Sequence, residues 1–300
     1  MIMAYLWIPV TIVAAAAQTV RNATQRGLTG ALGTVGATQV RFLYGLPFAL
    51  VFLAIVVTVG GVAPPTPGLK TMGFAVLGAL TQIAATALML MAMKERSFGV
   101  TTALIKTEPV LTALAGIFIL GDVPAPLAAV GIVVATIGVL VLSVRPGTFS
   151  GWLGIRPIAY GVAAAGFFSL SAISFRGAII GLPEAPFVLR ASTILVISLA
   201  LQTALLIVWM LVMDRPAMTA SFRAWRQSLL AGFMGALASQ FWFIGFSLTS
   251  AANVRTLALI EILFAQGISS RFMAQHTGRR ELAGMVLIVI GVGLLVIGVR

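Results

Sequence analysis

The chain has 300 residues, of which 60% are hydrophobic and only 9% are charged, whereas a soluble domain carries about 25% charged residues and could not cover its surface with so few. It contains no cysteine, which excludes disulfides, thiolate nucleophiles and cysteine-ligated metals and leaves the redox compartment open. The formal charge of +12 comes from Lys and Arg spread over short loops between apolar runs, so we expect these groups to face anionic lipid headgroups and expect no nucleic-acid partner.

The apolar runs are about 20 residues long, which suits a membrane-spanning helix and is twice the length of a barrel strand. The first run lacks the basic start of a signal peptide and is predicted to span the membrane. A loop at residues 60–68 and a tight turn at 121–124 are rich in Gly and Pro. The predicted helices, in chain order, cover residues 4–25, 34–59, 71–93, 98–120, 125–144, 158–181, 186–212, 226–248, 252–273 and 282–299. No soluble domain remains, so we predict an all-α membrane protein with ten transmembrane helices.

An internal repeat relates the two halves of the chain. A shift of 153 residues brings Glu108 onto Glu261, and it brings two glycines that are seven residues apart onto a second such pair. These glycines are Gly131 and Gly138 in the first copy, and Gly284 and Gly291 in the second. We therefore predict five-helix repeats at residues 1–147 and 148–300. Because five is an odd number, the second copy enters the membrane from the opposite side, which gives two inverted repeats around a central cavity with a site near the midplane.

Lys and Arg are distributed unevenly between the two sides of this arrangement. One side holds three of them, Lys70, Arg176 and Arg300. The loops of the other side hold twelve, namely Arg21, Arg26, Lys94, Arg96, Arg145, Arg156, Arg215, Arg223, Arg226, Arg271, Arg279 and Arg280. By the positive-inside rule, the side with twelve faces the cytoplasm and both termini lie outside.

Ionisable side chains within a bilayer are costly, so each is a candidate functional group. Lys106 and Glu108 are predicted in the middle of one helix, where a spacing of two residues turns them to nearly opposite faces. Lys106 shares a face with Thr102 and is the candidate to meet a substrate carboxylate in a water-filled cavity. The alternative is that Lys106 pairs with a carbonyl or with a glutamate of another helix. Glu108 and Glu261 are predicted as symmetry-related structural partners. One expected contact is a hydrogen bond to a backbone group beside Pro109 that lacks its helical partner. Proton coupling is the alternative role for either glutamate.

Three arginines are also predicted within helices. Arg41 and Arg190 occupy matching positions near one end of their helices, which favours a structural or gating role over contact with substrate. Arg255 lies near the start of its helix, and its position is compatible with either role.

Three predicted helices carry polar and aromatic side chains suited to an organic ligand. Small-molecule pockets combine flat apolar walls with a few fixed polar groups. Trp242, flanked by Gln240, is the strongest aromatic candidate, and ordinary packing or lipid contact is the alternative for each aromatic residue. The candidates are Gln82 and Thr86 in the third helix, Phe168, Ser171 and Phe175 in the sixth, and Gln240 and Trp242 in the eighth.

Signatures of catalysis and of resident metals are missing from the sequence. The one histidine, His276, falls in a predicted loop, and no HExxH motif, Walker loop or metal-binding cluster occurs. No TVGYG-type filter occurs either, which disfavours a channel. We therefore expect no enzymatic activity, no metal and no cofactor.

The segment ALIKTEPVLTAL at residues 103–114, followed by Gly121-Asp122 and a glycine-spaced helix, resembles the drug/metabolite transporter superfamily and most closely its EamA-type members. The second copy departs from this pattern, since Ile262 stands where the first copy has Pro109. The aromatic-rich sixth and eighth helices and the opening helix make the chain similar to the YddG-like exporters of aromatic amino acids. The resemblance implies ten helices in two repeats, a multi-pass location in the bacterial cytoplasmic (inner) membrane, export of small metabolites through a central cavity, and no prosthetic group.

The leading hypothesis is a secondary carrier that exports amino acids, with a preference for aromatic ones, by alternating access. The predicted contacts are Lys106 for the carboxylate, Gln82 and Gln240 for polar groups, and walls of Trp242, Phe168 and Phe175. The alternative is an exporter of cationic drugs, which the net charge of +2 among the predicted intramembrane groups disfavours. A non-transporting membrane enzyme or assembly protein is a third hypothesis, for which the sequence offers neither a catalytic cluster nor a soluble domain. The predicted partners are the lipid bilayer and a small-molecule substrate, and the oligomeric state stays open, with a monomer among the options.

Overall fold

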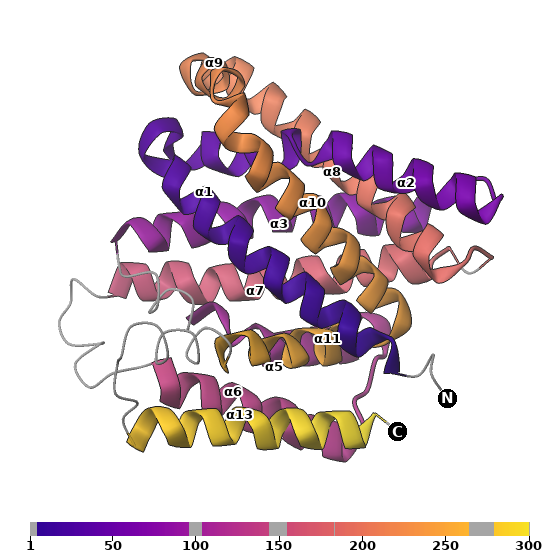
Figure 1. The fold of residues 1–300 in the computed structure, drawn as a ribbon, viewed down its shortest axis with the longest axis vertical. Helices are drawn as coiled ribbons and strands as arrows, with labels where there is room; N and C mark the ends of the chain where they lie inside the picture. The colour runs from indigo at the N-terminus through magenta and orange to yellow at the C-terminus, as the bar shows by residue number, and fades with distance from the viewer. Residues whose placement is uncertain (1–4, 96–103, 144–154, 183, 264–278, 300) are drawn as a thin grey trace.

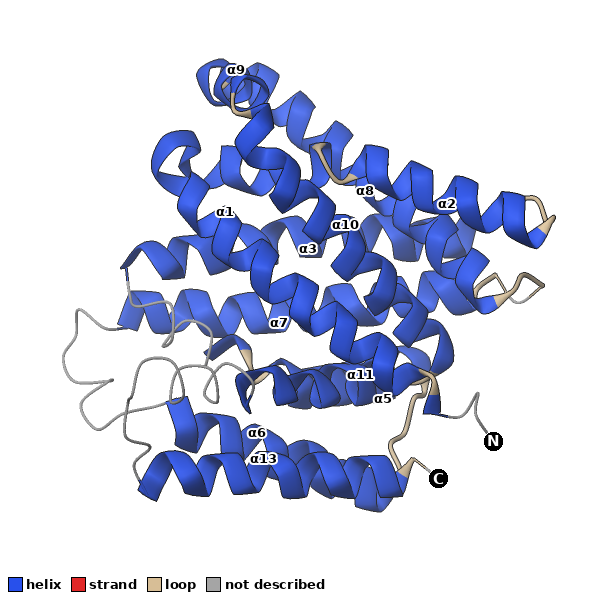
Figure 2. Ribbon diagram, viewed as in Figure 1, coloured by secondary structure: helices blue, strands red, loops and turns tan. Residues whose placement is uncertain are grey.

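The computed structural model describes residues 5–95, 104–143, 155–182, 184–263 and 279–299, and within these ranges all regular structure is helical (Figure 2). The elements follow one another through a single packed body (Figure 1). In chain order they are α1 (Trp7–Leu43), α2 (Leu46–Gly60), α3 (Leu69–Glu95), α5 (Glu108–Leu120), α6 (Pro126–Ser143), α7 (Ile155–Ile180), α8 (Phe187–Met213), α9 (Arg215–Arg223), α10 (Trp225–Leu248), α11 (Ala251–Leu257), the 3₁₀ helix η3 (Ala258–Ile260) and α13 (Arg279–Gly298).

The first two elements form one apolar stretch that is too long for a single crossing. Trp7–Gly60 covers 54 residues, or about 80 Å of helix, whereas the hydrocarbon core of a bilayer is about 30 Å thick. The backbone of Gly33 is not helical (φ 68°, ψ −180°), a conformation that only glycine adopts readily. Figure 1 shows α1 turning back before the chain continues into α2. The predicted break between residues 25 and 34 is therefore confirmed, although the helix before it extends further than expected. The helix predicted at residues 34–59 is not continuous, because α1 ends at Leu43 and α2 begins at Leu46.

Six stretches within the described residues are long and apolar enough to cross a membrane, so the chain is a multi-pass membrane protein. They are Trp7–Gly60, Leu69–Met93, Ile158–Ile180, Phe187–Met213, Trp225–Leu248 and Arg279–Gly298. Two shorter apolar helices, Glu108–Leu120 and Pro126–Leu142, lie between them in the chain. The predicted count of ten helices stays a prediction.

The predicted boundaries agree with α3, α7, α8 and α10 to within a few residues. The tight turn at residues 121–124 is also confirmed, because Gly121 ends α5 in the left-handed conformation (φ 71°). The connection between the seventh and eighth predicted helices contains an unpredicted short helix, α9. Asp214 caps it by accepting a hydrogen bond from the Ala217 N–H, and Pro216 stands in its first turn, where its missing N–H is not needed.

Glycines bring α6 and α13 into close contact along their lengths. A Cβ atom on Gly131 would lie 2.6 Å from the carbonyl oxygen of Gly291, and one on Gly138 would lie 2.8 Å from that of Gly284. Real Cβ atoms do not approach backbone this closely, so no larger residue fits without moving a helix. The prediction that these four glycines allow close helix contact is confirmed.

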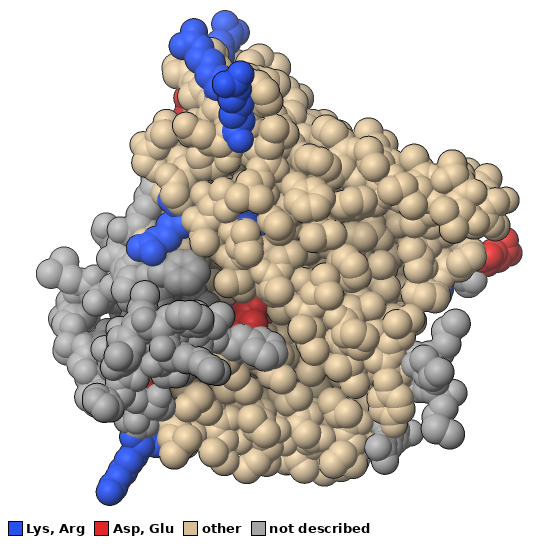
Figure 3. All heavy atoms as spheres, viewed as in Figure 1, with Lys and Arg blue, Asp and Glu red and all other residues tan. Residues whose placement is uncertain are grey.

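Several other packing pairs join the first half of the chain to the second. α1 packs on α10, α3 on α7, α2 on α8, and α5 on both α7 and α11. In Figure 1 the start of α1 and the end of α13 lie at the same edge of the molecule. Figure 3 shows a face on which charged side chains are sparse: the largest group of Lys and Arg lies at the end where α9 lies, and others lie at the left and lower left.

Candidate functional site

The helix predicted at residues 98–120 is broken in the part that the structure describes. Residues 104 and 105 are helical, residues 106 and 107 form a turn, and α5 begins at Glu108. Pro109 explains the break, because proline has no N–H to donate and its ring clashes with the carbonyl four residues earlier. The prediction that Lys106 and Glu108 lie mid-helix and face nearly opposite ways is therefore wrong, since both line one small cavity.

The helix predicted at residues 252–273 is interrupted at the corresponding place. α11 ends at Leu257, the 3₁₀ turn η3 covers the next three residues, and α-helix resumes at Glu261. Glu108 and Glu261 thus each begin a new helical segment after a break. Negative side chains are favourable at helix N-termini, and paired discontinuous helices are typical of sites near the membrane midplane.

Two ion pairs cross between these broken segments. Lys106 Nζ pairs with Glu261 Oε1. Arg255 Nε lies 2.9 Å from Glu108 Oε1, although neither atom has a hydrogen bond among the described residues. The N–H therefore does not point along the line to the oxygen, and the contact is an ion pair only. Each glutamate consequently pairs with a cation of the other half of the chain.

Arg255 also lies against two aromatic rings. Its guanidinium carbon is 4.4 Å from the ring centroid of Trp242 and 5.4 Å from that of Phe246, both of which are cation–π distances. Trp242 in turn donates its indole N–H to Gln18 Oε1 at 3.0 Å. One face of Trp242 is thus covered by Arg255 in this structure.

The cavity at the ion pairs is small, with a volume of about 30 Å³. Its polar lining is Gln18, Arg21, Asn22, Lys106, Glu108, Arg255 and Glu261, and its apolar lining is Met89, Met93, Ile105 and Phe168. Pockets for small molecules are about 300–1,000 Å³, whereas 30 Å³ holds roughly one or two waters. The cavity in this structure is therefore too small to hold an organic ligand.

Arg21 is the site residue that the sequence analysis missed. It was assigned to a cytoplasmic loop, but it lies inside α1 and is only 1% exposed. The apolar run ends at Arg21, which suggested a membrane exit, whereas the helix continues to Leu32 before the break at Gly33. Arg21 donates from Nε and Nη2 to the neighbouring Asn22 Oδ1 at 3.2 and 2.7 Å. Its Nη1 has no hydrogen-bond partner within the described residues.

Arg41 and two predicted substrate contacts belong to a neighbouring buried network. Arg41 donates from Nη1 to Thr86 Oγ1 at 2.9 Å. Gln82 accepts a hydrogen bond at 2.7 Å from the side-chain amide of Gln202 on α8. Thr86 also donates to the carbonyl of Gln82, so these groups hold α1, α3 and α8 together. Neither Gln82 nor Thr86 lines the closed cavity.

The other predicted site residues are divided between the cavity and the packed core. Phe168 lines the cavity. The ring centroid of Phe175 lies 4.8 Å from that of Phe243. Phe175 therefore makes ordinary aromatic packing, which is the alternative to substrate contact. Gln240 donates to Ser192 Oγ at 2.9 Å, and Ser171 is buried.

Two of the remaining predicted residues are not placed in the cavity. Arg190 is only half-buried at the start of α8, and its Nε lacks a hydrogen-bond partner within the described ranges. Thr102 lies outside the described residues.

Arg176, which the sequence analysis counted on the side with three basic residues, lies within α7. It pairs with Asp122 in the turn after α5, with its Nη2 donating to Oδ1 at 3.1 Å. Its Nη1 also donates to the carbonyl oxygens of Phe246 and Thr249 at the end of α10. Asp122 belongs to the Gly-Asp turn noted in the sequence, so this motif ties three helices together.

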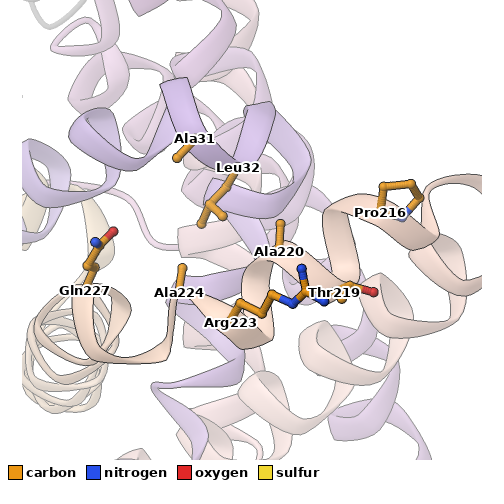
Figure 4. A pocket seen from close by; sticks show the side chains of 8 residues that line it. All are labelled: Ala31, Leu32, Pro216, Thr219, Ala220, Arg223, Ala224 and Gln227. Carbon is orange, nitrogen blue, oxygen red and sulfur yellow. The ribbon is translucent and has the colours of Figure 1, made fainter.

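A larger, open hollow of about 580 Å³ lies away from the ion pairs, between the turn of α1 and the α9–α10 connection. Leu32 of α1 points toward Ala220 and Ala224 there (Figure 4). Arg223 is the one charged residue in its lining. No predicted site residue contributes to this hollow, so it is separate from the candidate site.

Comparisons with known proteins agree with the membrane architecture. Residues 2–144 match the EamA-like transporter family, so the first half of the chain carries an EamA-like domain of the drug/metabolite transporter superfamily. No curated protein matches the chain. Among 29 matching chains of solved structures, one titled only "Crystal structure of protein" aligns with a TM-score of 0.66 at 16% identity and covers 98% of this chain and 94% of its own. At that identity the likeness shows a shared fold alone.

Proposed function

We propose that the chain is a secondary transporter that exports small metabolites by alternating access between two inverted halves. The EamA-like domain supports membrane transport. The observation that carries the proposal is the crossed pairing of repeat-related glutamates, Glu108 with Arg255 and Glu261 with Lys106. A site built from two broken helices, one in each half, is the arrangement found between the inverted repeats of many secondary transporters.

The helix contacts support ten crossings in two repeats, at residues 1–147 and 148–300. In that scheme α1 corresponds to α7 and α3 corresponds to α10. The α1–α10 and α3–α7 packing pairs are then equivalent contacts, because exchanging the two repeats turns one pair into the other. The α2–α8, α5–α11 and α6–α13 pairs each join equivalent helices, as a two-fold axis requires. For the location we propose the bacterial cytoplasmic (inner) membrane, with the basic loops on the cytoplasmic side, and the resemblance to bacterial exporters supports this proposal.

The ion pairs supply a means of closing the site. They join the two halves where both helices are broken, and the cavity that they line is only about 30 Å³. To admit a ligand, the halves must separate and the pairs must lengthen. Breaking a buried pair leaves uncompensated charge, so the open states need a ligand or water to replace the lost partners.

For the substrate we propose amino acids, with a preference for aromatic ones. The cavity combines cationic groups for a carboxylate with apolar walls from Met89, Met93, Ile105 and Phe168. Lys106 is engaged by Glu261 in the closed state and would meet the carboxylate only after that pair opens. A cationic drug is the weaker candidate, because three cations face two carboxylates in the lining and both carboxylates are already paired.

The test is uptake into proteoliposomes that contain the purified, folded chain. Labelled phenylalanine, tyrosine and tryptophan are compared with a cationic dye, and each is measured for the wild type and for Glu108→Gln. We expect saturable aromatic amino-acid uptake that Glu108→Gln abolishes and that Glu184→Gln, at an exposed glutamate, leaves intact. Uptake of the dye without the amino acids would reject the proposed substrate, and no uptake of any metabolite would reject transport.

A further inference from the structure

We infer that Arg21 is the anion-binding residue of the transport site and that the preferred ligand carries a carboxylate and a net negative charge. This inference rests on the proposed function, because it names the ligand of the same cavity. It replaces Lys106 by Arg21 as the first contact of the carboxylate, and it ranks an organic acid anion above the zwitterionic amino acids among the substrates of the proposed transporter.

The burial of Arg21 is the first argument. An arginine within a membrane helix is costly and normally pairs with an acidic group or with backbone carbonyls. Arg21 is 1% exposed, and a Cβ on Gly235 of α10 would lie 3.5 Å from its Cδ, so it is packed between helices. Its one hydrogen-bonding partner within the described residues is Asn22, a neutral neighbour on its own helix. Nη1 is left without a partner in the described part of the chain although the residue lines the cavity.

The charge inventory of the cavity is the second argument. Arg21, Lys106 and Arg255 face Glu108 and Glu261, and both carboxylates are taken by the other two cations. One positive charge is therefore unbalanced in the lining. A ligand with one net negative charge neutralises the site, whereas a zwitterion adds an ammonium group that must share a glutamate with Lys106 or Arg255. Electrostatics of the lining thus favour the anion.

The shape of the groups indicates which anion fits. A guanidinium presents its donors as a planar fork that matches a carboxylate. Arg21 lines the cavity, and its Nη1 has no hydrogen-bond partner within the described residues. Met89, Met93, Ile105 and Phe168 supply the apolar side of the same cavity. The ligand class is therefore a small organic acid with an apolar body, to which the carboxylate of an aromatic amino acid is the nearest zwitterionic relative.

Three probes with the same phenyl group separate these contributions. They are the anion phenylpropanoate, the zwitterion phenylalanine and the neutral amide phenylpropanamide. A ligand that binds only the folded state raises the thermal midpoint of the detergent-purified chain in proportion to its affinity. We expect the largest shift with phenylpropanoate, a smaller one with phenylalanine and none with phenylpropanamide. A shift with the amide equal to that with the acid, or a larger shift with phenylalanine than with the acid, would overturn the inference.

Variants then assign the effect to Arg21. Arg21→Gln should weaken phenylpropanoate binding at least about tenfold, since a charged hydrogen bond contributes about 1.5–3 kcal/mol. Arg21→Lys keeps the charge without the fork and should bind with intermediate affinity, which gives a second variant if Arg21→Gln does not fold. Arg223→Gln, at an exposed arginine of α9, is the matched control. Unchanged acid binding by folded Arg21→Gln would reject the role of Arg21, whereas aromatic uptake in proteoliposomes tests the proposed function separately.

Discussion

Arg255 and Glu108 are 147 residues apart in the sequence, yet the guanidinium Nε of Arg255 lies 2.9 Å from Glu108 Oε1 in the structure. The second pair, Lys106 with Glu261, crosses the same interface in the opposite sense. Both pairs join the places where a helix of each half is broken. In the proposed mechanism, opening the cavity and separating these charges are therefore one event.

Removing one charge of the pair should destabilise the closed protein. Glu108→Gln leaves Arg255 buried without its counter-charge, and breaking a buried pair in this way costs about 3–5 kcal/mol. The double variant Glu108→Gln with Arg255→Gln removes both charges and should recover most of that loss. Thermal unfolding of the single and double variants in detergent measures the coupling. Additive losses in the double variant would show that the two side chains do not stabilise each other.

The α6–α13 contact predicts opposite effects for two glycines on one helix. In Gly291→Ala the new Cβ would lie 2.3 Å from the Ala135 backbone nitrogen, so the helices must separate at a cost of about 1–3 kcal/mol. Gly293 has no atom within 4 Å of such a Cβ, and alanine there favours the helix by up to about 1 kcal/mol. Thermal midpoints of the two variants provide the comparison. Equal midpoints would contradict close packing at Gly291.

The Arg176–Asp122 pair should contribute more to stability than an acidic residue that only caps a helix. Asp122→Asn removes the counter-charge of Arg176 and should lower the unfolding free energy by about 1–2 kcal/mol. Asp214→Asn is the matched control, because asparagine caps a helix about as well as aspartate does. Denaturation of both variants in the same detergent gives the difference. A larger loss in Asp214→Asn would show that Asp122 is not the anchor of this turn.

The absence of cysteine from the chain makes a direct test of topology simple. Thr66, in the loop after α2, and Thr219, on α9, are both exposed. With inverted halves and basic loops inside, a cysteine at Thr66 should react with an impermeant thiol reagent from outside the cell. A cysteine at Thr219 should react only in inverted vesicles. Labelling of both positions from one side would contradict the proposed arrangement of crossings.

Much of the architecture could be predicted because hydropathy is a local signal. Runs of apolar residues located α3, α7, α8 and α10, and the spacing of Gly131 and Gly138 indicated a close helix contact. The register of Glu108 with Glu261 pointed to the two residues that begin the broken segments.

The site was harder to predict because it depends on where helices break and which charges meet. Pro109 signals its break locally, but the 3₁₀ turn before Glu261 contains no proline, and the structure offers no comparable local cause. Arg21 was assigned to a loop because an arginine at the end of an apolar run normally marks a membrane exit. Only the packing of α1 against α10 shows that its side chain is buried.

Alternating access is tested most directly by labelling one buried position with a thiol reagent from each side of the membrane. Met89 lines the cavity and is almost completely buried, so we choose Met89→Cys in the cysteine-free chain and an impermeant thiol reagent. A cysteine at Thr66 serves as the one-sided control. The account predicts that Met89→Cys reacts slowly in right-side-out and in inverted vesicles alike, since the cavity opens to each side in turn. Reaction from one side alone, with the Thr66 control behaving as expected, would contradict it.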